Sequence, residues 1–137
     1  MPFMVWEDNK FSVNINHLDV HHKRLFSLVN DLYDAMKGGK AKEVLGKILT
    51  ELINYTVYHF GAEEELFQKY GYPEYRQHKK EHEDLTNQAK DLKDRFDKGE
   101  VVALTMETMH FLRDWLNNHI CGSDKKYAPF LNSKGIA

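Results

Sequence analysis

Histidine occurs in this chain at positions where the hydrophobic pattern of a helix requires a core residue. Between residues 17 and 37, apolar residues recur at intervals of three and four, as on the buried face of an α-helix. That face comprises Leu18, Leu25, Val29, Leu32 and Met36. His22 fills the missing position of the series, while His21 lies about 100° around the helix. We therefore expect His22 to face the core and His21 to lie off that face.

Three further segments, 41–70, 73–97 and 101–121, show the same arrangement. Their predicted apolar faces are Leu45, Ile48, Leu52, Tyr55, His59 and Leu66; Tyr75, His78, His82, Leu85, Ala89, Leu92 and Phe96; and Val101, Leu104, Thr108, Leu112, Trp115 and His119. Glu63 follows His59 by four residues, so the two share one helical face. Each of the four predicted helices thus has histidine on its buried face.

Asp124 follows His119 by five residues. On a regular α-helix this spacing turns the second side chain about 140° away from the first. We therefore expect the helix to loosen or end there, with Gly122 supplying the backbone freedom. Asp124 would then reach back towards the other polar residues from an unwound terminus.

The predicted helices are joined by short segments around Gly38, Gly71 and Gly99, with Pro73 near the third helix start. Short connections make successive helices antiparallel neighbours. The sequence therefore predicts an all-α fold, an up-down-up-down antiparallel four-helix bundle. Residues 1–16 would form an N-terminal arm, and residues 1–137 one domain. This topology places the histidines of all four helices at the same end of the bundle.

Seven side chains at that end form a candidate metal site: His22, His59, Glu63, His78, His82, His119 and Asp124. Imidazole and carboxylate are typical ligands of iron, manganese and zinc. A single histidine on such a face is more often a hydrogen-bonded core residue than a ligand. However, each unpaired buried polar group costs roughly 2–7 kcal/mol, and a metal centre would satisfy five histidines together.

The number of candidate ligands restricts the kind of centre. Seven exceed the four ligands of tetrahedral zinc and suit two metals bridged by carboxylates. The ferritin-like di-iron pattern requires two Glu-x-x-His pairs. The one such pair here, Glu107 and His110, lies off the apolar face.

The pattern resembles that of the hemerythrin family, specifically the single-domain bacterial hemerythrins (bacteriohemerythrins), over almost the whole chain. The segment around Trp6 is similar to that family's N-terminal arm. The resemblance is carried by His22 within 18–23, the run 59–63, His78 and His82, and the run 119–124.

The resemblance implies a non-haem di-iron centre that binds O2 reversibly. His78, His82 and His119 would hold one iron, while His22 and His59 would hold the other and leave one position open for O2. Glu63 and Asp124 would bridge the two irons, together with an oxo or hydroxo group. The family pattern also implies an apolar O2 pocket lined by Leu25, Phe60, Trp115, Leu116 and Ile120. Such a dry pocket limits solvent access to the metals.

This chain departs from the family pattern at His21, which stands where glutamine is common. An accessory ligand role for His21 stays open beside its off-face position. Cys121 next to the site is interpreted as a small residue at a helix end rather than a redox group or ligand. The other polar neighbours (Glu64, Glu65, His17, His110 and Asp114) are expected to face solvent.

The composition is ordinary for a globular protein, with 42% hydrophobic and 29% charged residues in 137. A net charge of −2 gives no basis for nucleic-acid binding, and one cysteine excludes an internal disulfide. The sequence shows neither a signal peptide nor an apolar run of the roughly 20 residues that a membrane span needs. We therefore expect a cytoplasmic protein without membrane association.

Three functions remain in competition. The leading one is O2 binding for storage, transport or sensing, without catalysis, because the inferred pocket contains no candidate general acid or base. The alternative is a di-iron oxidase, peroxidase or nitric oxide-processing enzyme that uses the same open iron. Iron storage is the third, but this site accommodates two metals rather than many. The protein that receives the O2 is not indicated.

Overall fold

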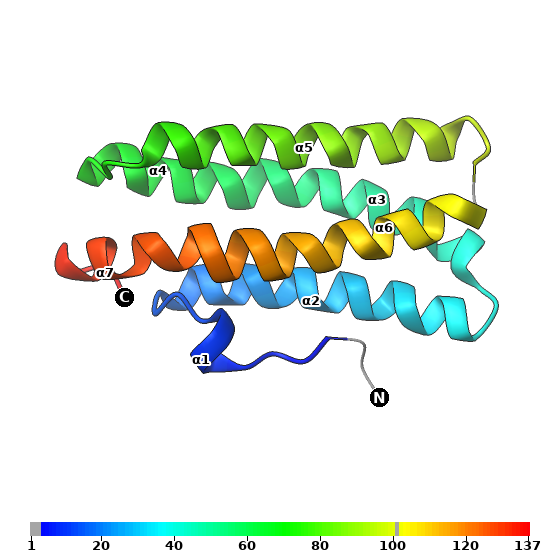
Figure 1. Ribbon diagram of the computed structural model, residues 1–137, viewed down its shortest axis with the longest axis horizontal. Coiled ribbons are helices and arrows are strands. Elements are labelled where there is room, and N and C mark those ends of the chain that lie inside the picture. Colours follow the sequence, from blue (N-terminus) through cyan, green and yellow to red (C-terminus); the bar gives the residue numbers. More distant parts are fainter. Residues whose placement is uncertain (1–3, 101) are drawn as a thin grey trace.

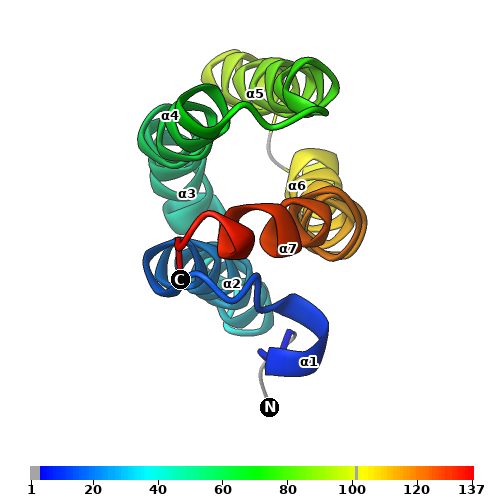
Figure 2. The same ribbon diagram turned by 90° about the vertical axis from the view of Figure 1, so that its left-hand side faces the viewer.

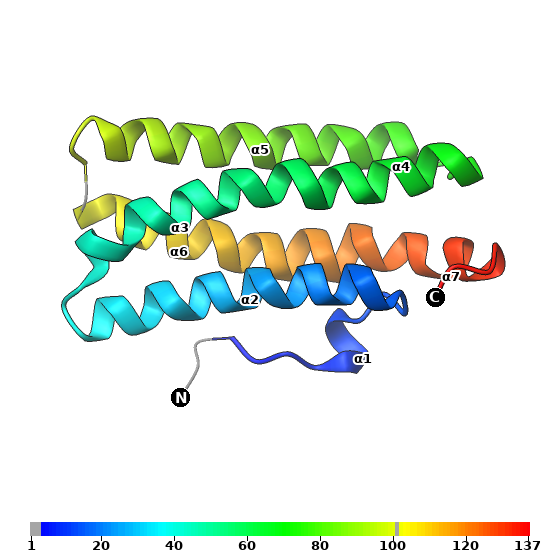
Figure 3. The same ribbon diagram turned by 180° about the vertical axis from the view of Figure 1, so that it is seen from behind.

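The computed structural model describes residues 4–100 and 102–137, and the described elements are all helical. Four long antiparallel rods form a bundle, which confirms the predicted up-down-up-down fold (Figures 1 and 3). The first rod is α2 (Asn16–Lys37) and the third is α5 (Tyr75–Asp97). The second rod comprises α3 (Ala41–Tyr55), η1 (Thr56–Phe60) and α4 (Gly61–Tyr70). The fourth comprises α6 (Val102–Asp114), η2 (Trp115–Asp124) and α7 (Lys125–Ser133).

The N-terminal arm contains one short helix, α1 (Asp8–Phe11), and lies outside the four rods (Figure 2). Its aromatic residues attach it to the bundle, because the rings of Trp6 and Phe11 both pack against Phe26 of α2. Further along, the backbone N–H of Val13 donates to Asp19. The arm therefore covers an apolar part of the bundle.

The predicted end of the fourth helix at residue 121 is wrong. The rod continues to Ser133, and its middle section, Trp115–Asp124, is a π-helix rather than an unwound terminus. A π-helix bonds residue i to residue i+5, so its wider turn brings residues five apart onto one face. His119 and Asp124 come together in this way, and Gly122 is not among the glycines with a positive φ.

The candidate ligands form a polar layer between two apolar clusters. The larger cluster includes Leu25, Phe60 and Ile120, and the smaller includes Leu18, Phe67 and Tyr127. His22, Glu63 and Asp124 each lie between a residue of one cluster and a residue of the other in sequence, whereas His59 and His119 directly precede Phe60 and Ile120. Apolar packing above and below therefore holds the polar layer in place and keeps it from water.

None of the described helices combines the length and the apolar character needed to cross a membrane.

Candidate metal centre

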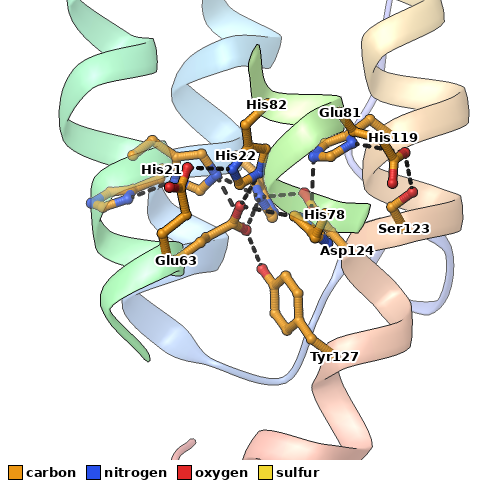
Figure 4. Close-up of polar contacts among 12 residues, drawn as sticks. His21, His22, Glu63, His78, Glu81, His82, His119, Ser123, Asp124 and Tyr127 are labelled. Atoms are coloured by element: carbon orange, nitrogen blue, oxygen red, sulfur yellow. Dashed lines mark hydrogen bonds and ion pairs between the residues drawn. The ribbon is translucent and has the colours of Figure 1, made fainter. Parts of the chain in front are cut away.

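The structure brings all seven predicted ligands together in two groups that share their carboxylates. Ligand atoms of Glu63, His78, His82, His119 and Asp124 lie within 4.8 Å of one another. Ligand atoms of His22, His59, Glu63 and Asp124 likewise lie within 4.8 Å of one another. All seven residues are buried, and the six of them that Figure 4 labels converge from all four rods. We call these the three-histidine group and the two-histidine group.

Glu63 presents one oxygen to each group. Its Oε1 lies 3.0 Å from Nε2 of His82 and 3.6 Å from Nε2 of His78. Its Oε2 lies 3.5 Å from Nε2 of His22 and 3.4 Å from Nε2 of His59. The carboxylate therefore faces both groups at once, as a bridging ligand must.

Asp124 repeats this arrangement from the fourth rod. Its Oδ1 lies 2.8 Å from Nε2 of His78 and 3.1 Å from Nε2 of His119. Its Oδ2 lies 3.1 Å from Nε2 of His22. Two carboxylates on opposite rods thus divide their oxygens between the same two groups of imidazoles.

These close atoms do not satisfy one another as hydrogen-bond partners. Six of them are buried without a hydrogen-bond partner among the described residues: Glu63 Oε1, His78 Nε2, His82 Nε2, His119 Nε2, and Asp124 Oδ1 and Oδ2. Such groups are costly to bury unpaired. Convergent imidazole nitrogens and carboxylate oxygens are a donor set that metal cations satisfy, and first-row transition metals such as iron fit it.

In the absence of a metal, the carboxylates of the site favour protonation of three of its histidines. Burial opposes protonation of the histidines, but the carboxylates of Asp124 and Glu63 outweigh it. The pKa values of His22 and His78 are raised to about 9, and that of His119 to about 10. Without a metal, the two carboxylates are therefore neutralised by imidazolium groups.

The pKa values of His59, Glu63 and Asp124 are lowered instead. Burial lowers the pKa of His59 to about 4, despite the nearby charge of Glu63. Burial alone would raise the pKa values of Glu63 and Asp124, but the surrounding histidines hold both well below their usual range. Both carboxylates are therefore charged at neutral pH and available as metal ligands.

Three candidate ligands, His59, His82 and His119, are contacted at the ring nitrogen Nδ1 by a further side chain. Nδ1 of His59 lies 2.9 Å from Nδ1 of His21, and Nδ1 of His82 lies 3.0 Å from Glu64 Oε2. The expectation that Glu64 faces solvent is therefore wrong, because α4 directs it towards α5; Glu65 is exposed as expected. Such outer partners fix the orientation of metal-binding imidazoles.

On the fourth rod, Nδ1 of His119 lies 3.5 Å from Glu81 Oε1. Ser123 donates a hydrogen bond of 2.5 Å to the same oxygen. Glu63 itself accepts a hydrogen bond from the buried hydroxyl of Tyr127. None of these partners was predicted, because each contact joins residues far apart in sequence.

Local helix geometry also contributes to the site in a way that the sequence analysis missed. His59 lies in η1, and His119 and Asp124 lie in η2. π-helical turns occur frequently at functional sites. The five-residue spacing of His119 and Asp124 predicts that the helix loosens or ends there; the helix loosens into η2 and does not end.

The five predicted pocket residues are all buried in the larger apolar cluster. Phe60 stacks on the ring of His82, with centroids 3.8 Å apart and planes at 3°. Trp115 packs against Phe60 at 5.4 Å. The structure thus places Phe60 directly beside a candidate ligand and Trp115 behind Phe60. The role of the five residues in lining an O2 pocket stays a prediction.

The remaining polar residues singled out in the sequence lie outside the two groups. His17, His110 and Asp114 are exposed, as predicted. Cys121 is half-buried, and burial raises the pKa of its thiol. A protonated thiol is a poor nucleophile, which agrees with the interpretation of Cys121 as a small packing residue.

The sequence and the fold match known proteins over most of the chain. Residues 13–131 match the family model described as the hemerythrin HHE cation binding domain. A bacteriohemerythrin from Methylococcus capsulatus is 41% identical over 97% of this chain and all of its own length. A hemerythrin-like protein from Naegleria gruberi is 37% identical over 90% of this chain and 91% of its own. A crystal structure of wild-type hemerythrin superposes with a TM-score of 0.83 and 40% identity, covering 93% of this chain and 96% of that one.

Proposed function

Because this chain belongs to the hemerythrin family, we propose that it binds O2 reversibly at a non-haem di-iron centre, for oxygen storage, transport or sensing. His78, His82 and His119 would hold one iron, and His22 and His59 the other. Glu63 and Asp124 would bridge them. The observation that carries the proposal is the division of both carboxylates between the two histidine groups.

The unequal size of the groups supports an open position on one metal. The three-histidine group offers three imidazoles and two carboxylates, whereas the two-histidine group offers two imidazoles and the same carboxylates. The metal in the two-histidine group thus has one protein ligand fewer. A small ligand from solution would bind there.

When bound, the irons would supply electrons to O2 on binding and recover them on its release. The chain's own residues hold the ligands and exclude water. Glu63 and Asp124 offset the positive charge of the metals, and the outer contacts of His21 and Glu64 fix two of the imidazole rings. Leu25, Phe60, Trp115, Leu116 and Ile120 form the dry surroundings that protect the bound ligand.

The test is iron content together with the visible spectrum of the reduced protein, exposed to air and then deoxygenated. We expect two irons per chain and an absorption band that appears with O2 and disappears on its removal. His119→Ala should abolish the band, whereas His110→Ala, an exposed histidine on the same rod, should leave it unchanged.

Other outcomes separate the alternatives. A ferric spectrum that forms irreversibly while O2 is consumed would replace reversible binding with a di-iron oxidase or peroxidase. Steady turnover of peroxide or nitric oxide well above that of free iron would likewise indicate an enzyme. A protein that fails to hold two metals would refute the proposed centre.

A further inference from the structure

Tyr55, the last residue of α3, buries a hydroxyl group that has no hydrogen-bond partner among the described residues. Its side chain is among the largest that are fully buried. The two other buried tyrosines differ, because Tyr127 donates to Glu63 and Tyr72 donates to Glu74. Buried polar groups are nearly always paired in folded proteins. The unpaired hydroxyl of Tyr55 therefore requires an explanation.

The ring of Tyr55 lies against the two-histidine group. It stacks on the imidazole of His59, with centroids 4.9 Å apart and planes at 24°. Its edge packs against Trp115 at 5.9 Å. Tyr55 thus lies between a candidate ligand of the metal with fewer protein ligands and a predicted wall of the pocket.

A tyrosine hydroxyl carries one O–H that can donate a hydrogen bond to an acceptor. The hydroxyl of Tyr55 is buried and has no partner among the described residues, and its ring lies against His59. This donor is therefore free for a ligand that enters beside His59.

A phenylalanine would fill the same space and stack on His59 without leaving a polar atom unpaired. In the absence of a ligand, the hydroxyl thus makes the fold less stable than it could be. Sites that bind ligands often retain such unsatisfied groups, since the ligand completes them.

We propose that the Tyr55 hydroxyl donates a hydrogen bond to the small ligand, O2 or a compact anion, that occupies the open position of the two-histidine group. This inference rests on the proposed function, because it adds a polar contact to the otherwise apolar O2 pocket. It also assigns Tyr55 as a residue that sets ligand affinity without binding metal.

Azide binding to the oxidised, iron-loaded protein tests this assignment in Tyr55→Phe. Azide is a compact anion that accepts hydrogen bonds, and its binding is followed in the visible spectrum. Tyr58→Phe is the matched control, because Tyr58 packs beside Tyr55 but is 47% exposed. We expect azide to bind about three- to tenfold more weakly to Tyr55→Phe, as for the loss of one hydrogen bond. Tyr58→Phe should bind it like the wild type.

The thermal midpoint of the metal-free protein provides a second readout. If the hydroxyl has no partner within the protein, Tyr55→Phe should keep or raise the midpoint. A lower midpoint would mean that the hydroxyl is paired inside the fold, which would overturn the assignment. Unchanged azide affinity at equal iron content would also overturn it.

These results are distinguishable from failure of the proposed function. A wild-type protein that binds O2 reversibly, paired with a variant of unchanged azide affinity, refutes only the role of Tyr55. A wild-type protein that holds no iron refutes the proposed centre, and the assignment of Tyr55 falls with it.

Discussion

The Nδ1 atoms of His21 and His59 lie 2.9 Å apart, although their residues come from different rods of the bundle. The opposite nitrogen of His59, Nε2, lies 3.0 Å from Nε2 of His22 and faces Glu63. His21 is half-buried, off the apolar face of α2 as predicted, and contacts a candidate ligand from behind. The two-histidine group is thus supported by an imidazole, whereas the three-histidine group is supported by the carboxylates of Glu64 and Glu81.

Replacement of His21 by alanine should weaken iron retention while two irons still bind at saturation. Loss of an outer partner of a metal-binding histidine typically lowers metal affinity by about 10- to 100-fold. His21→Gln should retain most of the affinity, because an amide oxygen can accept the hydrogen bond from His59. Competition with a chelator measures both variants. A saturated His21→Ala protein with a single iron would instead identify His21 as a ligand.

Glu64→Ala should release iron from the three-histidine group more readily than the wild type. The variant loses the carboxylate that contacts Nδ1 of His82 at 3.0 Å, and we again expect roughly a 10- to 100-fold loss of affinity. Glu65→Ala is the control, because Glu65 is its exposed neighbour on α4. Equal iron retention in the two variants would show that the Glu64 contact does not support the site.

Gly122→Ala should leave iron content unchanged and should stabilise the fold by up to about 1 kcal/mol, since alanine is the better helix former. A Cβ atom at Gly122 meets nothing within 4 Å. Gly46→Ala should instead cost about 1–3 kcal/mol, because its Cβ would lie 2.6 Å from the Phe96 ring. Urea unfolding measures the change in the free energy of unfolding for both variants. Loss of iron from Gly122→Ala would instead support the expectation that the backbone freedom of Gly122 lets Asp124 reach the site.

The metal-free protein should be most stable near pH 6.5. The pKa values of His22, His78 and His119 are raised in the fold, so their contribution is complete below pH 6.5. It is lost as the pH rises through about 9 to 10. The pKa of His59 is lowered to about 4, so its contribution is present above pH 6.5 and is lost as the pH falls towards 4.

The metal-loaded protein should lack the alkaline loss, because metal ligation requires neutral imidazoles at every pH. At acidic pH the metal-loaded protein should lose stability more steeply than the metal-free protein, because protons compete with the metals for the imidazoles and carboxylates. Urea midpoints of both forms between pH 5 and 10 measure these trends. A metal-free protein that became more stable between pH 7 and 9 would contradict the raised histidine pKa values.

The sequence alone determined which faces of the helices are buried and which end of the bundle is polar. His22 and Glu63 could be placed because a helix of 3.6 residues per turn puts residues three and four apart on one face. Short connections then fixed the antiparallel order of the rods. These predictions depend only on local periodicity and on chain connectivity, both of which can be read from residue order.

The tertiary structure decided the contacts that complete the site. Asp124 reaches the ligand groups through the π-helical turn of η2 rather than an unwound end, and His21 and Glu64 meet His59 and His82 across the boundaries between rods. No local period encodes such contacts. They depend on how the rods are rotated against one another and on side-chain rotamers, which are settled only when the apolar clusters on both sides of the polar layer pack together.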